Sequence, residues 1–212
     1  MKINKYCVLK IFLILLMFVG IIIFWENLPN NMPVHWNFSG QIDKYWPKLY
    51  AVFLAPILGI LFVVLFSVLS RIDPRKEKYK KFRKTWEIIQ IAILAFVTYL
   101  QFIILYMSIV PNGDITKLVL LGIGVLFVLL GNYMGKVRQN YFVGFKTPWA
   151  LADEHVWNKT QRVGGLMFVL AGIVFIVEAF FQWYLLAVFI ITLLFTVFLP
   201  ILYSYWVFKK NK

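Results

Sequence analysis

The sequence is short of charged residues and of cysteine, and both shortages narrow what the protein can be. Only 15% of its 212 residues are charged, whereas 62% are hydrophobic; this balance disfavours an ordinary soluble domain. A single cysteine excludes an internal disulfide and a multi-cysteine zinc or iron–sulfur site. Twelve glycines and eight prolines are too few for a fibrous repeat. The composition therefore indicates a polytopic membrane protein.

Sequence patterns of catalysis and metal binding are also missing. There is no HExxH, GxSxG, Walker or GxGxxG motif. The two histidines, His35 and His155, fall on opposite sides of the membrane in the topology derived below, so they cannot share a metal ion. We expect no metal and no other cofactor, and the sequence favours a protein that is not an enzyme.

Long hydrophobic runs are what the sequence has in abundance. A helix needs about 20 apolar residues to cross a hydrocarbon core about 30 Å thick. Six uncharged runs of this order predict an all-α polytopic membrane protein with six transmembrane helices, at residues 11–25, 49–69, 88–110, 118–134, 164–181 and 184–208. A basic segment precedes the first run, as in a signal peptide, but no small-residue cleavage site follows it, so we expect an uncleaved anchor.

The distribution of basic residues predicts the orientation, because loops rich in Lys and Arg stay in the cytoplasm. With the N-terminus inside, 19 of the 22 Lys and Arg residues fall on the cytoplasmic side. Both termini are therefore expected in the cytoplasm. The net charge of +13 then reflects topology and attraction to the headgroups of membrane lipids, and no direct binding of nucleic acid is expected.

Ionisable side chains are nearly absent from the six runs, which argues against a proton-coupled pump. Glu178 is the one candidate, and it lies about one helical turn from the next tight turn, where it can reach the outer interface. Gln90 and Gln101 favour hydrogen bonding between helices over an ion pathway. The spacing of Gly131 and Gly135 indicates close helix packing.

The connection between the first two runs carries the first informative motif. Residues 28–44 read LPNNMPVHWNFSGQIDK; the prolines favour extended backbone, and the alternation that follows predicts a small β-hairpin turning at Ser39-Gly40. Its rings form either an aromatic belt, with a surface pair between Asp43 and Lys44 or Lys48, or a surface that recognises an extracellular ligand. On the second interpretation, the candidate ligand-binding residues are His35, Trp36, Asn37 and Asp43.

A basic stretch precedes the third run. Asp73-Pro74 is typical of a helix N-cap followed by proline at the first helical position. Tyr79, Phe82 and Trp86 follow at helical spacing, opposite a face of Lys and Arg, and predict an amphipathic helix at the cytoplasmic surface that leads into the third span. That helix either lies against lipid or docks a cytoplasmic partner.

The longest cytoplasmic connection, at residues 131–163, carries the second motif. Residues 140–149 read NYFVGFKTPW, and Thr147-Pro148 is typical of a helix start. We expect one interfacial helix to run from there into the fifth span, with Gln161 on its polar face. Six residues of this loop either tie it to helix ends or form a partner surface: Asn132, Asn140, Lys146, Trp149, Glu154 and Arg162.

Together the two motifs resemble the SdpI family of bacterial membrane immunity proteins. Residues 28–43 are similar to the N-terminal domain that precedes SdpI modules, and residues 131–162 are similar to the SdpI signature. Lys146 departs from the family pattern, where arginine is expected; it keeps the charge but loses the bidentate fork. The resemblance implies a two-span region at residues 1–70, with the motif in an extracellular loop, and a four-span region at residues 71–212, with a cytoplasmic signature loop at residues 131–163.

The resemblance implies a multi-pass protein of the bacterial plasma membrane that gives resistance to a secreted, membrane-active peptide toxin met on the extracellular side. It also implies, for some members, a signalling role in which a winged-helix autorepressor is held at the membrane from the cytoplasm. Two other classes stay open. One is a small transporter or exporter of an amphiphilic peptide or lipid, supported by Gln101 and Glu178. The other is an enzyme that uses His35 and Asp43 as acid and base.

Overall fold

The computed structural model describes residues 4–37 and 39–211, and these are mostly helical. Six helices are long and apolar enough to cross a membrane, which confirms the six predicted spans. They are α1 (Lys5–Phe24), α2 (Lys48–Ile72), α4 (Arg83–Ile109), α5 (Ile115–Met134), α7 (Glu154–Phe181) and α8 (Leu185–Lys210). Each helix extends beyond its hydrophobic run, because polar residues at its ends continue the helix. Of the residues used in the sequence patterns, Lys2, Phe38 and Lys212 lie outside the described part.

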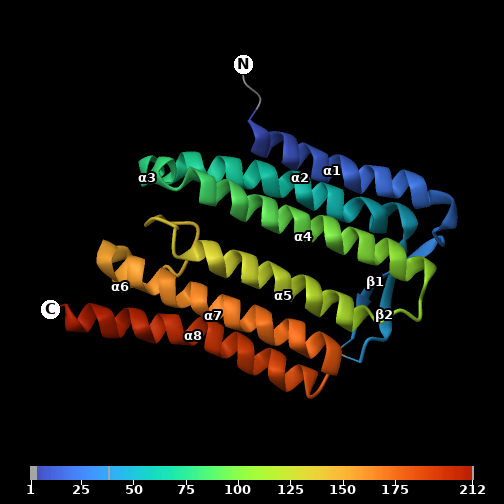
Figure 1. The fold of residues 1–212 in the computed structure, drawn as a ribbon. Helices are drawn as coiled ribbons and strands as arrows, with labels where there is room; N and C mark the ends of the chain where they lie inside the picture. Colours follow the sequence, from blue (N-terminus) through green and yellow to red (C-terminus); the bar gives the residue numbers. More distant parts are fainter. Residues whose placement is uncertain (1–3, 38, 212) are drawn as a thin grey trace.

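The six helices lie side by side, and the chain enters and leaves the bundle at the same end (Figure 1). We call this the terminal end; it also carries the short helices α3 (Lys76–Lys81) and α6 (Pro148–Ala152). The opposite end carries the 3₁₀ turn η1 (Trp25–Asn27) and the strands β1 (Asn31–Trp36) and β2 (Ile42–Pro47), and we call it the hairpin end. His35 and His155 lie at opposite ends of the bundle, in β1 and in the first turn of α7.

The long helices form two groups of three. In one group α4 packs against α1 and α2, and in the other α7 packs between α5 and α8. The facing helices α4 and α5 form the boundary between the groups (Figure 1). Packing is closest between α5 and α7, where a Cβ atom added at Gly131 would lie 2.5 Å from the carbonyl oxygen of Gly165. The predicted packing role of Gly131 therefore has its partner in α7.

The hairpin expected from the first motif is present. β1 and β2 pair antiparallel, with Asn31 opposite Pro47 and Trp36 opposite Ile42. In the turn, the side-chain oxygen of Asn37 accepts the backbone N–H of Ser39 at 3.0 Å and that of Gln41 at 2.9 Å, so the asparagine closes the turn as backbone would. The bundle is helical, as predicted, but the described residues also form one two-stranded sheet. The predicted all-α fold class does not include this sheet.

The predicted helix start at Asp73 is wrong. The Asp73 carboxylate accepts the N–H of Arg75 at 2.7 Å and closes a turn, and α3 begins only at Lys76. The chain departs from helical geometry again at Phe82 before α4 begins. The stretch that leads into the third span thus consists of a turn, α3 and the start of α4. The Asp73 carboxylate accepts a backbone N–H of the turn and does not cap a helix.

The helix expected after Thr147 starts correctly and ends early. The Thr147 hydroxyl accepts the N–H of Ala150 at 3.1 Å, as an N-cap does. The single helix predicted to continue into the fifth span is interrupted at Asp153, whose backbone is extended at φ −135° and ψ 127°. Its carboxylate accepts the N–H groups of His155 and Val156, so Asp153 ends α6 and caps α7.

Candidate functional site

The exposed polar site of the hairpin is a histidine–carboxylate pair. His35 Nδ1 lies 2.5 Å from Asp43 Oδ1, with 64% and 44% of the two side chains exposed. A bulge on either side of His35 sets it opposite Lys44 rather than Asp43 in the strand register, and the imidazole reaches diagonally to the carboxylate. The structure thus brings together two of the four ligand-binding candidates on a solvent-facing surface.

Trp36 occupies a different environment from His35. Its indole packs against the cluster of Ile103, Met107 and Ile115, and its Nε1 atom is buried without a hydrogen-bond partner among the described residues. A ring held against α4 and α5 in this way does not form an exposed aromatic belt. A buried indole N–H without a partner carries a desolvation cost, and it leaves an unpaired donor at the turn end of the hairpin.

A cavity of about 230 Å³ lies beside Trp36, between the hairpin and the bundle. The hairpin contributes two of the ligand-binding candidates, and helices α5 and α8 contribute the rest of a mainly apolar lining: Trp36, Asn37, Ile115, Thr116, Val119, Leu120, Ile123, Leu185 and Phe189. Concave apolar sites with a few polar groups at the rim bind apolar side chains or hydrocarbon. The four hairpin candidates thus divide into an exposed polar pair, His35 and Asp43, and two residues that line an apolar cavity, Trp36 and Asn37.

Lys48 anchors the hairpin and does not pair with Asp43. Its Nζ atom donates to the carbonyl oxygens of Trp25 at 2.6 Å and Leu28 at 3.0 Å, and it lies 4.4 Å from the centroid of the Trp25 ring. The expected surface pair between Asp43 and Lys48 is therefore absent from the described residues. Lys48 instead joins α2 to the segment that enters the hairpin.

At the terminal end, Asn140 organises the signature loop. Its fully buried side chain accepts the N–H groups of Phe142 and Val143 at 2.8 and 2.7 Å through Oδ1. The Nδ2 atom donates to the carbonyl oxygens of Arg138 and Val143. Because these four bonds go to backbone of the same loop, Asn140 fixes the loop conformation, and its buried side chain has no exposed atom to offer a partner.

Asp73 and Tyr79 lock this loop to α2 and α3, a connection that sequence reasoning missed. Asp73 Oδ2 lies 3.0 Å from the Tyr79 hydroxyl and also accepts the N–H of Tyr141 at 3.0 Å. The Tyr79 hydroxyl is 3.3 Å from Asn140 Oδ1 as well. Burial, together with the hydrogen bond to Asp73, raises the pKa of Tyr79, so the phenol stays protonated and donates. A lone aspartate before proline gave no signal of a partner 68 residues away.

The aromatic stripe of Tyr79, Phe82 and Trp86 lies inside the protein. The three side chains are only 4–6% exposed and pack with Val137 and Trp157 in one cluster. The prediction that this stripe faces lipid or a cytoplasmic partner is therefore wrong. The helical spacing identified the face correctly, but the signature loop and α7 cover it.

Three further loop candidates make separate contacts. Asn132 is exposed on α5 and donates to the carbonyl of Val128 in its own helix. Lys146 is exposed and donates to the Phe142 carbonyl at 3.2 Å. The Trp149 ring lies 5.0 Å from the Tyr205 ring, centroid to centroid. They do not form one site.

Glu154 and Arg162 differ in whether they have a partner. Glu154 accepts a hydrogen bond from Lys78 of α3 at 2.6 Å, which joins α7 to α3. Arg162 is exposed on α7, and no hydrogen bond or ion pair of its guanidinium is present in the described part of the chain. It lines a basic pocket together with residues of α3, α4 and the signature loop.

Among the described residues, the spans hold one buried acid, Glu178, and one buried lysine, Lys10. Glu178 of α7 is 7% exposed, and its Oε1 has no hydrogen-bond partner among the described residues. Lys10 of α1, expected to lie in the basic flank, is 9% exposed and reaches Glu87 at 2.7 Å and Gln90 at 2.8 Å. Gln101 donates to the Val52 carbonyl at 3.1 Å, as expected for a hydrogen bond between helices.

Comparison with known proteins gives two matching families and one similar characterised chain. Residues 136–204 match the SdpI/YfhL protein family, and residues 12–60 match a domain of unknown function, DUF1648. Over 207 residues the chain is 26% identical to immunity protein SdpI of Bacillus subtilis (strain 168), covering 97% of each chain. No solved structure matches. The region 12–60 contains the hairpin, and the region 136–204 begins in the signature loop and runs into α8.

Proposed function

We propose, from the match of residues 136–204 to the SdpI/YfhL family, that this multi-pass membrane protein is an immunity protein against a secreted, membrane-active peptide toxin. The observation that carries this proposal is the similarity to immunity protein SdpI, which covers 97% of both chains and therefore includes both motifs. The proposal places the hairpin end outside the cell, in agreement with the asymmetry of Lys and Arg.

Binding at the hairpin, without chemistry, is the proposed mechanism. An apolar side chain of the toxin enters the cavity beside Trp36, and a polar group of the peptide hydrogen-bonds to the adjoining His35–Asp43 pair. Burial of apolar surface in the cavity supplies affinity, and the exposed pair supplies orientation. A toxin molecule held at the outer leaflet does not insert further.

The geometry supports binding better than catalysis. Acid–base work needs a base whose orientation is fixed by a third group, and no third described side chain hydrogen-bonds to His35 or Asp43. The cavity lining contains Thr116 as its one hydroxyl, with no described histidine or carboxylate bonded to it. Recovery of toxin with unchanged mass from resistant cells is the expected result.

Survival of toxin-treated cells tests the hairpin site. Asp43→Ala removes the partner of His35, and Val119→Phe fills the cavity; each should lower resistance about tenfold or more while membrane levels stay equal. Glu26→Gln is the matched control, because Glu26 is an exposed acid at the same end with no ion pair in the described residues. Full resistance in both test variants would refute binding at the hairpin.

The family resemblance also supports a partner at the terminal end, and we include a winged-helix autorepressor held there from the cytoplasm as part of the proposal. The exposed Lys146 and Lys159 present charge that an acidic protein surface would bind. Co-purification of the autorepressor with membranes should fall in a Lys146→Glu, Lys159→Glu variant. Equal co-purification would remove this part of the proposal and leave toxin binding intact.

A transporter of amphiphiles is the second candidate function, and Glu178 is the observation that favours it. A buried carboxylate oxygen without a described partner is unusual within a span. Uptake of toxin into inverted vesicles, abolished by Glu178→Gln, would support transport. Resistance without uptake, and unchanged by Glu178→Gln, supports immunity by binding.

A further inference from the structure

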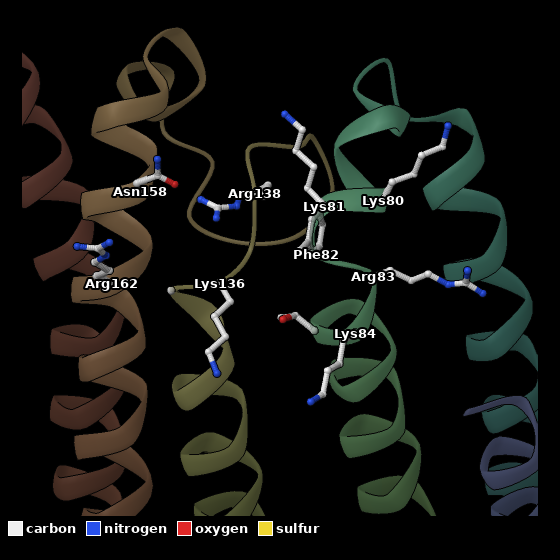
Figure 2. Close-up of a pocket in the computed structure, with 11 residues that line it drawn as sticks. Lys80, Lys81, Phe82, Arg83, Lys84, Lys136, Arg138, Asn158 and Arg162 are labelled. Atoms are coloured by element: carbon white, nitrogen blue, oxygen red, sulfur yellow. The ribbon is translucent and has the colours of Figure 1, made fainter. Parts of the chain in front are cut away.

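The terminal end holds a basic pocket of about 610 Å³ at the boundary between the two helix groups. It is lined from the α3–α4 junction on one side and from the end of α5, the signature loop and α7 on the other. In Figure 2 the Lys84 side chain lies beside α4 and the Lys136 side chain lies over the end of α5, with Arg138 above Lys136, whereas Lys80, Lys81 and Arg83 extend outward. The pocket therefore sits over the seam between these two helices.

The pocket gathers positive charge that the described acids neutralise only in part. Seven Lys and Arg residues line it and no carboxylate does: Lys80, Lys81, Arg83, Lys84, Lys136, Arg138 and Arg162. The neighbouring acids are engaged, since Glu77 pairs with Lys80 and Glu154 pairs with Lys78. Apart from Lys80, none of the seven makes an ion pair in the described part of the chain. A pocket lined by cations and by no carboxylate has a positive potential, so it is suited to an anion.

The N-terminus of α4 adds to the same field. Its cap residue Phe82 makes no side-chain cap hydrogen bond, and its first turn contains no acid but holds Arg83 and Lys84. Cations at a helix N-terminus oppose the helix dipole, and the free N–H groups there favour an anion. Thr85 of this turn lines the pocket. An anion in the pocket would accept hydrogen bonds from the free N–H groups of α4 and would also neutralise the charge of the lining Lys and Arg residues.

A separate apolar groove lies further along the α4–α5 seam. It has a volume of about 290 Å³ and is lined by residues of α4 and α5: Ala92, Ala95, Phe96, Tyr99, Leu121, Gly122, Val125, Leu126 and Leu129. Ala92 follows Thr85 by two turns of α4, so one face of α4 lines both pocket and groove. On the other side Leu129 lies in the last turns of α5, and Lys136 follows the end of that helix. Seven residues of helix correspond to about 10 Å, a spacing that separates a lipid phosphate from the middle of an acyl chain.

We propose that the α4–α5 seam is a binding site for an anionic phospholipid, with its phosphate-bearing headgroup in the basic pocket and one acyl chain in the apolar groove. Charge complementarity selects the headgroup, and the groove selects a lipid over a soluble phosphate. The bound lipid fills the boundary between the two helix groups and joins them. This site is remote from the hairpin, so it does not depend on toxin binding.

The test uses the purified full-length protein in detergent and measures lipid binding by native mass spectrometry over a lipid concentration series. Dioleoyl phosphatidylglycerol is compared with dioleoyl phosphatidylcholine, which has the same chains and no net charge. We expect phosphatidylglycerol to bind at least tenfold more tightly. Lys84→Gln with Lys136→Gln should weaken phosphatidylglycerol about 30-fold and leave phosphatidylcholine unchanged. Ala95→Leu, which fills the groove, should weaken both lipids.

A double variant of Lys209 and Lys210 to Gln is the matched control, because both are exposed on α8 at the same end and lie outside the pocket. It removes the same charge and should leave lipid binding unchanged. Equal affinity for the two lipids, or an equal loss in the control, would overturn the proposal. Displacement of lipid by inorganic phosphate alone, with no effect of Ala95→Leu, would show an anion site without a lipid and would also overturn it.

Discussion

Gln161 of α7 binds both backbone groups of Phe145: its Oε1 accepts the Phe145 N–H at 3.0 Å and its Nε2 donates to the Phe145 carbonyl at 3.0 Å. The glutamine is fully buried. Beside it, Gly144 has a φ of +109°, and a Cβ atom there would lie 2.6 Å from Gln161 Oε1. The signature loop thus closes onto α7 through one side chain and one glycine, and both are open to direct test.

Replacement of Gln161 by leucine should destabilise the protein by about 2–4 kcal/mol, because two backbone groups of the loop would stay buried without partners. Thermal unfolding in detergent, with proteolysis of the loop as a second readout, measures the change. Lys159→Leu is the control, since Lys159 is exposed on the same helix. An equal effect of the two variants would show that the pair of bonds does not hold the loop.

Gly144→Ala and Gly135→Ala form a matched pair of glycine substitutions in the same connection. At Gly144 the positive φ and the contact with Gln161 should cost about 1–3 kcal/mol. At Gly135, with φ −63°, the nearest atom to a new Cβ is Arg162 Cγ at 3.3 Å, on a flexible side chain, and the cost should stay below about 0.5 kcal/mol. Unfolding midpoints compare the two directly; similar values would contradict the role given to Gly144.

The six spans and the hairpin could be predicted because they depend on local patterns. Hydrophobic runs of about 20 residues are sufficient to define spans, and alternation with Ser39-Gly40 at the turn is sufficient for a hairpin. The proximity of His35 and Asp43 followed from that hairpin alone. The helix boundaries were less accurate, because polar caps such as Asp153 lie outside the hydrophobic signal.

The buried polar connections could not be predicted, because their partners are distant in sequence. Lys10 and Gln90 are 80 positions apart, so the lysine was assigned to a basic flank by its neighbours alone. Gln161 was assigned to a polar face by helical periodicity counted from Thr147. The break at Asp153 resets the phase of the helix, which turns Gln161 inward and makes that count invalid.

Lys10 and Glu87 form an ion pair in which the side chains are only 11% and 14% exposed. Removing one partner of such a pair should destabilise the protein more than removing both. Lys10→Met alone leaves a buried carboxylate without its cation and should cost about 3–5 kcal/mol. Lys10→Met with Glu87→Met replaces both charges by apolar groups and should cost less than either single change. Unfolding of the four proteins in detergent completes the cycle. A double variant less stable than both single variants would contradict a buried pair.

The orientation of the bundle decides which partner can reach the hairpin, and cysteine labelling of intact cells measures it. The Cys7→Ser background removes the native cysteine, whose thiol is exposed. In this background Ser39→Cys places one exposed cysteine at the hairpin end, and Lys159→Cys, in a second variant, places one at the terminal end. A membrane-impermeant maleimide should modify position 39 in intact cells and position 159 only after permeabilisation, because the basic end stays inside. Labelling of both positions in lysed cells controls for accessibility. The reverse pattern would place the His35–Asp43 pair in the cytoplasm, where a secreted toxin does not meet it.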